Sequence, residues 1–228
     1  MTYIIGECGL SHNGSLATAK KMVDALIECG ADCAKFQMYN SDTLCSYFYQ
    51  PELYKKFTEC ELTNWQMVEL SEYCKTVGID FMCTPEGIPE AVFLNAIVDK
   101  WKISSVGACN PHLLKMINTF GKPVYISNGL ANDDAIDIAD ELLKDCEVTW
   151  LSCVCAYPAG KWEYLWMASG IGLSDHTTGL NLPVTWNPTV IEKHFTLDKT
   201  QDGFDHHMSL DPVEMKEYIR RIRGGKNA

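Results

Sequence analysis

The sequence predicts an α/β fold, specifically a compact (β/α)8 TIM barrel that occupies residues 1–228 as a single domain. Two observations lead to this prediction. Short apolar runs alternate along the chain with segments of helical period, which is the pattern of a parallel sheet covered by helices. In addition, polar residues that are suited to chemistry follow the apolar runs, where the loops at the carboxyl ends of barrel strands form a common mouth.

Eight apolar runs are expected to be the strands of the barrel. They are 3–8, 33–37, 79–83, 101–105, 123–127, 148–153, 172–174 and 190–194.

Helices are expected between most of these runs, where apolar residues recur at helical spacing. They are 16–30, 63–77, 86–96, 111–120, 133–144 and 212–223. Thr63 and Gln66 form a capping box at the start of the second helix. Segment 179–187 is short, contains Pro183 and is followed by Pro188, so the region of the seventh helix is predicted to be trimmed. Segment 38–62 is rich in Tyr and Phe and is expected to be a long loop that forms a lid or an interface.

The composition narrows the possible partners and the location of the protein. The formal net charge is −11, which argues against nucleic acid and anionic membranes as partners. No stretch approaches the roughly 20 apolar residues of a membrane span, and no secretory signal opens the chain. The 11 cysteines are scattered, so we expect reduced, mostly buried thiols. We therefore predict a cytoplasmic protein.

Histidines paired with acids near the C-terminus suggest a divalent metal site. Glu192 and His194 lie two apart on the last expected strand, so their side chains point the same way, into the barrel mouth. His176 follows the neighbouring strand and is the natural second ligand. The simpler interpretation is that each imidazole only satisfies a buried hydrogen bond. The clustering of these runs at adjacent strand ends favours the metal site.

Charged and hydroxyl side chains are expected at the ends of the other strands. Glu7 is a candidate base or ligand support, or else a buried acid paired with a lysine. Lys35 and Lys102 are suited to binding a phosphate or forming a Schiff base, or else to a structural ion pair. Three serines also end strands, although a serine there is commonly a cap or turn former. They are Ser105, Ser127 and Ser174.

Taken together, these motifs resemble the N-acetylneuraminate (sialic acid) synthase family. The matching stretches keep the family's order over nearly the whole chain, and it is the ordered set that is specific. They are 5–14 (IGECGLSHNG), 30–37 (GADCAKFQ), 83–85 (CTP), 102–105 (KISS), 127–129 (SNG), 157–158 (YP), 174–177 (SDHT), 192–197 (EKHFTL) and 205–206 (DH).

The resemblance implies a catalytic TIM barrel that condenses phosphoenolpyruvate with the open-chain aldehyde of an N-acyl amino sugar, such as N-acetylmannosamine. Phosphate is released and a nonulosonic acid forms. A divalent metal, Mn²⁺ or Mg²⁺, would be held by His176 and His194. Phosphoenolpyruvate would lie against Lys35, Thr84, Lys102, Ser105, Ser127 and Ser174. Sugar contacts would map to Gln37, Tyr157 and Asp205, with Glu7 and Glu192 near the reacting centre, so that Glu7, Glu192 and Asp205 are the catalytic candidates.

The chain also departs from the family pattern. Gly107, Asn128 and Cys155 replace an acid, a threonine and a polar residue that are common there. The chain stops at Ala228, without the antifreeze-like domain that follows the barrel in the family. In the family that domain reaches the barrel of a partner subunit and contacts the sugar's N-acyl group. A homodimer and a separate polypeptide that supplies this domain are therefore candidate partners, besides phosphoenolpyruvate and the amino sugar.

Three other functions compete with this interpretation. One is a related phosphoenolpyruvate-dependent sugar-acid synthase that uses another aldehyde. The second is a catalytically impaired barrel that binds a sugar or a partner. The third is a Schiff-base aldolase in which Lys35 or Lys102 is the nucleophile.

Overall fold

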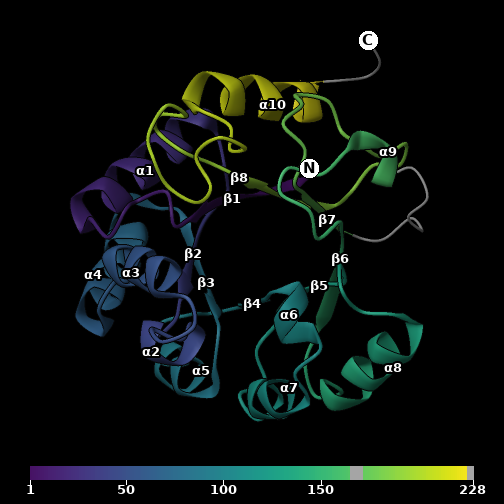
Figure 1. Ribbon diagram of the computed structural model, residues 1–228. Helices are drawn as coiled ribbons and strands as arrows, with labels where there is room; N and C mark the ends of the chain where they lie inside the picture. Colours follow the sequence, from purple (N-terminus) through teal and green to yellow (C-terminus); the bar gives the residue numbers. More distant parts are fainter. Residues whose placement is uncertain (165–171, 225–228) are drawn as a thin grey trace.

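Eight parallel strands form a nearly closed barrel with helices around it, in a computed structural model that describes residues 1–164 and 172–224 (Figure 1). The strands are β1 (Tyr3–Gly9), β2 (Cys33–Met38), β3 (Asp80–Pro85), β4 (Trp101–Ile103), β5 (Val124–Ser127), β6 (Val148–Cys153), β7 (Gly172–Asp175) and β8 (Val190–His194). Their order in the sheet is β3-β2-β1-β8-β7-β6-β5-β4. The (β/α)8 barrel predicted from the sequence is therefore confirmed, and each expected strand is present.

The barrel has a seam between β3 and β4. These strands end the hydrogen-bonded order of the sheet, and they pack against each other without a backbone ladder between them in the described part of the chain. The other neighbouring strands are joined by parallel ladders, for example Glu7 with Lys35 and Ser174 with Glu192. The seam is therefore closed by side chains.

Ten helices are described, and most of them cover the outside of the strands (Figure 1). They are α1 (Leu16–Cys29), α2 (Ser41–Leu44), α3 (Pro51–Cys60), α4 (Asn64–Val77), α5 (Ile88–Leu94), α6 (Ser105–Ala108), α7 (Pro111–Asn118), α8 (Asp133–Leu142), α9 (Lys161–Tyr164) and α10 (Pro212–Gly224). The capping box of Thr63 and Gln66 is present at the start of α4, as predicted. In the described part of the chain, no helix combines the length and the apolar character that a membrane span needs.

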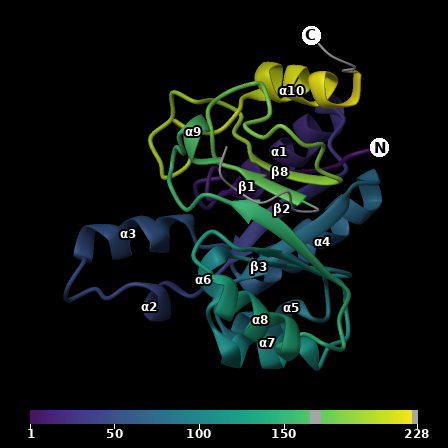
Figure 2. The ribbon, with the colours of Figure 1, turned by 90° about the vertical axis from the view of Figure 1, so that its right-hand side faces the viewer.

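Of three expectations about local structure, one is confirmed and two are wrong. The trimmed seventh helix is confirmed, because no helix lies between β7 and β8. Segment 38–62 was expected to be a long loop, and this is wrong: it contains α2 and α3, which stand out from one side of the barrel (Figure 2). Ser105 was expected to end the fourth strand. It begins α6 instead, because the hydroxyl of Ser104 accepts a hydrogen bond from the N–H of Gly107 and caps that helix.

The core is formed by the outer faces of the strands and the apolar stripes of the helices. One row of apolar side chains on each of α1 and α4, including Leu26 and Leu70, is buried against β1, β2 and β3. All 11 cysteines are unpaired, and most of them are buried, as the sequence analysis expected. Their reduced state stays a prediction. The inner face of the barrel carries polar side chains at its carboxyl end, and these form the site described next.

Candidate active site

A cavity of about 250 Å³ opens at the carboxyl ends of the strands. Every residue that the sequence assigned to the site lines this cavity, although the strands that carry them are far apart in the chain. They are Glu7, Lys35, Gln37, Thr84, Lys102, Ser105, Ser127, Tyr157, Ser174, His176, Glu192, His194 and Asp205. The structure thus brings the predicted residues together, and their individual roles stay predictions.

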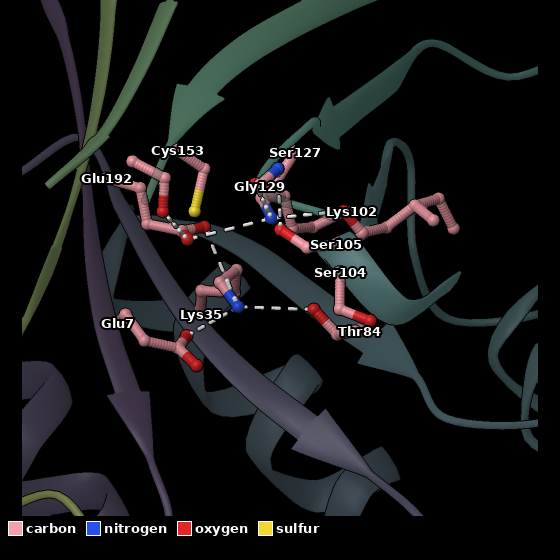
Figure 3. A network of polar contacts seen from close by, with 12 residues as sticks. Glu7, Lys35, Thr84, Lys102, Ser104, Ser105, Ser127, Gly129, Cys153 and Glu192 are labelled. Carbon is pink, nitrogen blue, oxygen red and sulfur yellow. Dashed lines mark hydrogen bonds and ion pairs between the residues drawn. The ribbon is translucent and has the colours of Figure 1, made fainter. Parts of the chain in front are cut away.

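Lys35 stands between two carboxylates at the bottom of the cavity (Figure 3). Its Nζ lies 2.8 Å from Oε2 of Glu7 and 3.6 Å from Oε2 of Glu192, and it donates a 3.1 Å hydrogen bond to the hydroxyl of Thr84. Burial alone lowers the pKa of Lys35, but the attraction of Glu192 and Glu7 outweighs burial and raises it above its ordinary value. Lys35 is therefore a firmly charged ammonium.

Lys102 is the second buried ammonium, and it is less well compensated. Its Nζ donates to the hydroxyl of Ser127 at 2.8 Å and to the carbonyl of Ile103 at 3.1 Å, and it lies 3.6 Å from Oε1 of Glu192 (Figure 3). Burial lowers the pKa of Lys102, and the attraction of Glu192 recovers only part of this shift. An anion that entered the cavity beside Lys102 would supply the charge that this lysine lacks.

Glu192 is ionised although it is buried. Burial raises the pKa of Glu192, but Lys102, Lys35 and the hydroxyl of Ser174 together hold it below its ordinary value. The hydroxyl of Ser174 donates to Oε1 at 2.9 Å, whereas Oε2 accepts no hydrogen bond in the described part of the chain. One carboxylate oxygen thus remains available to a ligand.

Ser105 holds the backbone of the loop after β5 in place at the rim of the cavity. Its hydroxyl accepts a 3.1 Å hydrogen bond from the N–H of Gly129, in the loop after β5. Next to Gly129, the amide oxygen of Asn128 accepts from the N–H of Cys153 at 3.1 Å. These bonds fix the ends of β4, β5 and β6 relative to one another.

The two imidazoles lie side by side, with ring centroids 5.4 Å apart. Nδ1 of His176 is 2.7 Å from the carbonyl oxygen of Val154. Because a carbonyl only accepts, Nδ1 carries the proton and Nε2 keeps its lone pair, which is the form that binds metals. Burial, reinforced by His194, lowers the pKa of His176 to about 4, so this ring is neutral at pH 7. Nδ1 of His194 is buried and has no hydrogen-bond partner among the described residues, and it lies 3.9 Å from Oδ2 of Asp205.

These donors fit a metal ion that takes only two ligands from the protein. Within 1–164 and 172–224, no group of three or more His, Cys, Asp or Glu side chains is placed to hold a metal. The remaining positions around an ion bound by His176 and His194 would belong to water and to substrate oxygens, as is common for Mg²⁺ and Mn²⁺. The unpaired nitrogen of His194 and the neutral form of His176 support this fit.

The predicted sugar-binding residues lie around the imidazoles. The amide of Gln37 donates to Oε1 of Glu7 at 2.7 Å, and Oδ2 of Asp205 accepts from the N–H of Leu10 at 3.1 Å. The ring of Tyr157 lies 4.2 Å from that of His176, and 53% of this residue is exposed. Tyr157 therefore covers the imidazoles on the solvent side.

A buried ion pair on the outer face of the barrel strands joins β7 and β8, at whose ends the two imidazoles lie. Lys193 and Asp175 face each other across β8 and β7, with 2.8 Å between Nζ and Oδ2, and both side chains are at most 1% exposed. Asp175 also accepts hydrogen bonds from the N–H and hydroxyl of Thr177 and from the hydroxyl of Tyr218 on α10. This network is fully satisfied, and it fixes the register that places His176 next to His194.

Comparison with known proteins decides the family. The chain matches the NeuB family over residues 22–228. It belongs to that family. It is 33% identical to the N,N'-diacetyllegionaminic acid synthase of Legionella pneumophila, over 97% of this chain and 71% of that protein. It is 32% identical to the human N-acetylneuraminate-9-phosphate synthase, over 97% of this chain and 69% of that protein.

Solved structures of NeuB-family proteins have the same barrel. The structure of the N-acetylneuraminic acid synthetase of Leptospira borgpetersenii in complex with citrate superposes with a TM-score of 0.89 at 30% identity, over 99% of this chain and 86% of that one. The resemblance deduced from the sequence is thus confirmed. The chain is also 36% identical to an uncharacterised protein of Methanocaldococcus jannaschii, over 97% of this chain and 70% of that protein.

Several residues of this NeuB-family cavity were not found by sequence reasoning. Cys153 lines the cavity and its Sγ lies 3.9 Å from Nδ1 of His176, whereas Cys155, which the sequence singled out, is exposed. Glu86 also lines the cavity, and burial raises its pKa. Its place directly after β3 was the available signal, since strand ends carry the other site residues. The others are Leu10, Phe57, Ser104 and Phe204.

Proposed function

We propose that this protein condenses phosphoenolpyruvate with the open-chain aldehyde of an N-acyl amino sugar of the N-acetylmannosamine type. Inorganic phosphate leaves and a nonulosonic acid forms. The observation that carries the proposal is the pair of buried lysines, Lys35 and Lys102, beside the imidazoles of His176 and His194 in one cavity. Relatives named as legionaminic, pseudaminic and N-acetylneuraminate-9-phosphate synthases support the class of reaction.

The lysines and hydroxyls would bind the anionic substrate. Lys102 has an incomplete charge balance and lies with Ser127 on the β4–β5 side, while Thr84 and Lys35 face it from β3 and β2. Phosphate and carboxylate groups of phosphoenolpyruvate would replace internal contacts of these side chains. Charge-assisted hydrogen bonds of this kind fix the enol carbon relative to the aldehyde.

The reaction needs charge stabilisation at two atoms. When the enol carbon of phosphoenolpyruvate forms the new C–C bond with the aldehyde carbon, positive charge develops at the phosphate-bearing carbon. Glu192 is ionised close to both lysines and would stabilise that charge. Water then adds to this carbon and gives one proton to Glu7, while the aldehyde oxygen takes up a proton and becomes a hydroxyl group. The bond from the phosphate-bearing carbon to the phosphate oxygen then breaks, the remaining proton of the added water leaves with phosphate, and a ketone remains.

A divalent metal, Mn²⁺ or Mg²⁺, would be held by His176 and His194. When bound, the ion would polarise the aldehyde oxygen. Around it, Asp205, Gln37 and Tyr157 would orient the hydroxyl groups of the sugar. We also propose a cytoplasmic location, since unpaired thiols persist in reducing compartments.

The test is phosphate release from phosphoenolpyruvate across a panel of hexosamine and pentose aldehydes, with Mn²⁺ present or chelated. We expect release with N-acetylmannosamine-type aldehydes and its loss on chelation. Preferred release with another aldehyde would indicate a related sugar-acid synthase. Absence of release with every aldehyde would contradict the proposal and favour a barrel that only binds sugar.

A second candidate is a Schiff-base aldolase, which the lowered pKa of Lys102 favours because it makes the amine easier to deprotonate. Borohydride treatment in the presence of pyruvate would trap the covalent adduct on Lys102. The condensation proposed above forms no imine, so the protein would stay unmodified.

A further inference from the structure

One wall of the otherwise polar cavity is apolar. We define the aromatic wall as Leu10, Phe57 and Phe204, which all line the cavity. Leu10 follows β1, Phe57 lies on α3 and Phe204 lies in the loop after β8. The two phenyl rings are stacked, with centroids 4.8 Å apart and planes 17° from parallel. Both phenylalanines are only half-buried, so part of their surface remains free to contact a ligand in the cavity.

The aromatic wall is held in place by contacts on both sides. The hydroxyl of Tyr39 donates to the carbonyl of Phe57 at 2.9 Å, and its ring meets the Phe57 ring edge-on at 5.5 Å. On the other side, the N–H of Leu10 donates to Oδ2 of Asp205, directly after Phe204. The wall is therefore built by the fold, and α3 brings Phe57 to it from the part of the molecule that stands out in Figure 2.

The wall lies away from the lysines, beyond the carboxylates. A Cβ built on Gly9 would come within 2.3 Å of Oδ2 of Asp205 and 3.6 Å of Oε1 of Glu7, so this glycine, with φ of +48°, fills the space between them. Glu7 in turn pairs with Lys35. The cavity thus runs from ammonium groups, through carboxylates and imidazoles, to the aromatic wall.

We propose that the aromatic wall is the subsite for the acyl group of the substrate's acylamino substituent, and that it makes the protein selective for N-acylated sugars. This inference rests on the proposed function. A sugar aldehyde whose carbonyl lies at the imidazoles carries hydroxyl groups, which Asp205 and Gln37 can hydrogen-bond, and one apolar group, which is the acyl methyl. The exposed surface of Phe57 and Phe204 is the apolar surface that this methyl can cover.

The first experiment measures KM for both substrates in Phe204→Ala and Phe57→Ala. We expect KM for N-acetylmannosamine to rise about tenfold, as for the loss of a small apolar contact in a pocket, while KM for phosphoenolpyruvate stays the same. N-butanoylmannosamine, whose longer acyl chain fills the space left by the ring, should recover most of the loss. Phe204→Leu should retain an apolar surface and most of the affinity.

The matched control is Phe48→Ala. Phe48 belongs to the same protruding segment, but it is 90% exposed and does not line the cavity. This variant should bind both substrates like the parent protein. Equal increases of KM for both substrates in the wall variants, or no recovery with the butanoyl sugar, would overturn the inference.

The second experiment does not depend on turnover. Saturation-transfer difference NMR with N-acetylmannosamine should give the strongest transfer at the acyl methyl protons, and this preference should vanish in Phe57→Ala/Phe204→Ala. Methyl protons that receive no more saturation than the sugar's other protons would refute the proposal that the aromatic wall binds the acyl group. Strong methyl saturation without phosphate release from any aldehyde would refute the proposed function and leave the subsite standing.

Discussion

Lys35 and Lys102 are both buried, yet their replacement by methionine should affect stability to different extents. Lys35→Met removes the close counter-ion of Glu7 and leaves Glu192 with Lys102 alone. Breaking a buried ion pair by removing one partner costs about 3–5 kcal/mol. Since 1 kcal/mol shifts Tm by about 2–4 °C in a chain of this size, Lys35→Met should lower Tm by roughly 6–20 °C.

Lys102→Met should lower Tm much less than Lys35→Met in the absence of ligand. A lysine whose pKa is raised by folding stabilises the protein at all pH values below its unfolded pKa, which applies to Lys35. The pKa of Lys102 is lowered, so its charge costs stability at pH 7, and this cost disappears as pH rises through its folded pKa. Removing the charge relieves that cost, which offsets much of the loss of the 3.6 Å pair with Glu192.

The same replacement should impair substrate binding. A hydrogen bond to a charged group contributes about 1.5–3 kcal/mol, so Lys102→Met should raise KM for phosphoenolpyruvate about 10- to 150-fold. Calorimetry of the ligand-free proteins and phosphate-release kinetics measure the two effects, with Lys144→Met, an exposed lysine, as the control. A large fall of Tm in Lys102→Met, or none in Lys35→Met, would refute this account of the charges.

Three further predictions follow from the site. His194→Ala should weaken Mn²⁺ binding, measured by electron paramagnetic resonance, and abolish metal-dependent phosphate release; unchanged binding would refute the metal site. Burial raises the pKa of Glu86, and once the pH exceeds this pKa the negative charge of Glu86 opposes the binding of phosphoenolpyruvate. Glu86→Gln should therefore lower KM for phosphoenolpyruvate at high pH and flatten the pH dependence of this KM. A pH profile of KM parallel to that of the parent protein would exclude this role. Lys193→Met should lower Tm, because breaking a buried pair costs about 3–5 kcal/mol, and Asp175→Asn added to it should restore most of the loss; a double variant no more stable than the single one would contradict this.

The strands and most of the site could be predicted because both depend on local pattern. Apolar runs identify buried strands, and side chains at their carboxyl ends must converge once a parallel barrel closes. Glu192 and His194 could be placed on one face from the strand period alone. The family motifs then assigned roles that the residue pattern by itself left open.

The remaining features depend on tertiary packing, which has no local signal. Phe57 reaches the cavity only because Tyr39 and Phe204 hold α3 against the barrel mouth. Ser105 continues an apolar run in sequence, but the capping hydroxyl of Ser104 ends the strand earlier. The charge state of Lys102 likewise follows from distances to groups on three other strands.

The seam of the barrel has a consequence for how the protein responds to its substrate. Thr84 lies near the end of β3 and Lys102 lies on β4. A phosphate ester held by both would therefore bridge the two edges that have no backbone ladder between them in the described part of the chain. Edges joined only by side chains are natural places for local opening and amide exchange. A ligand in the cavity should therefore hold β3 and β4 together and slow hydrogen–deuterium exchange along these two strands more than along β1 and β8.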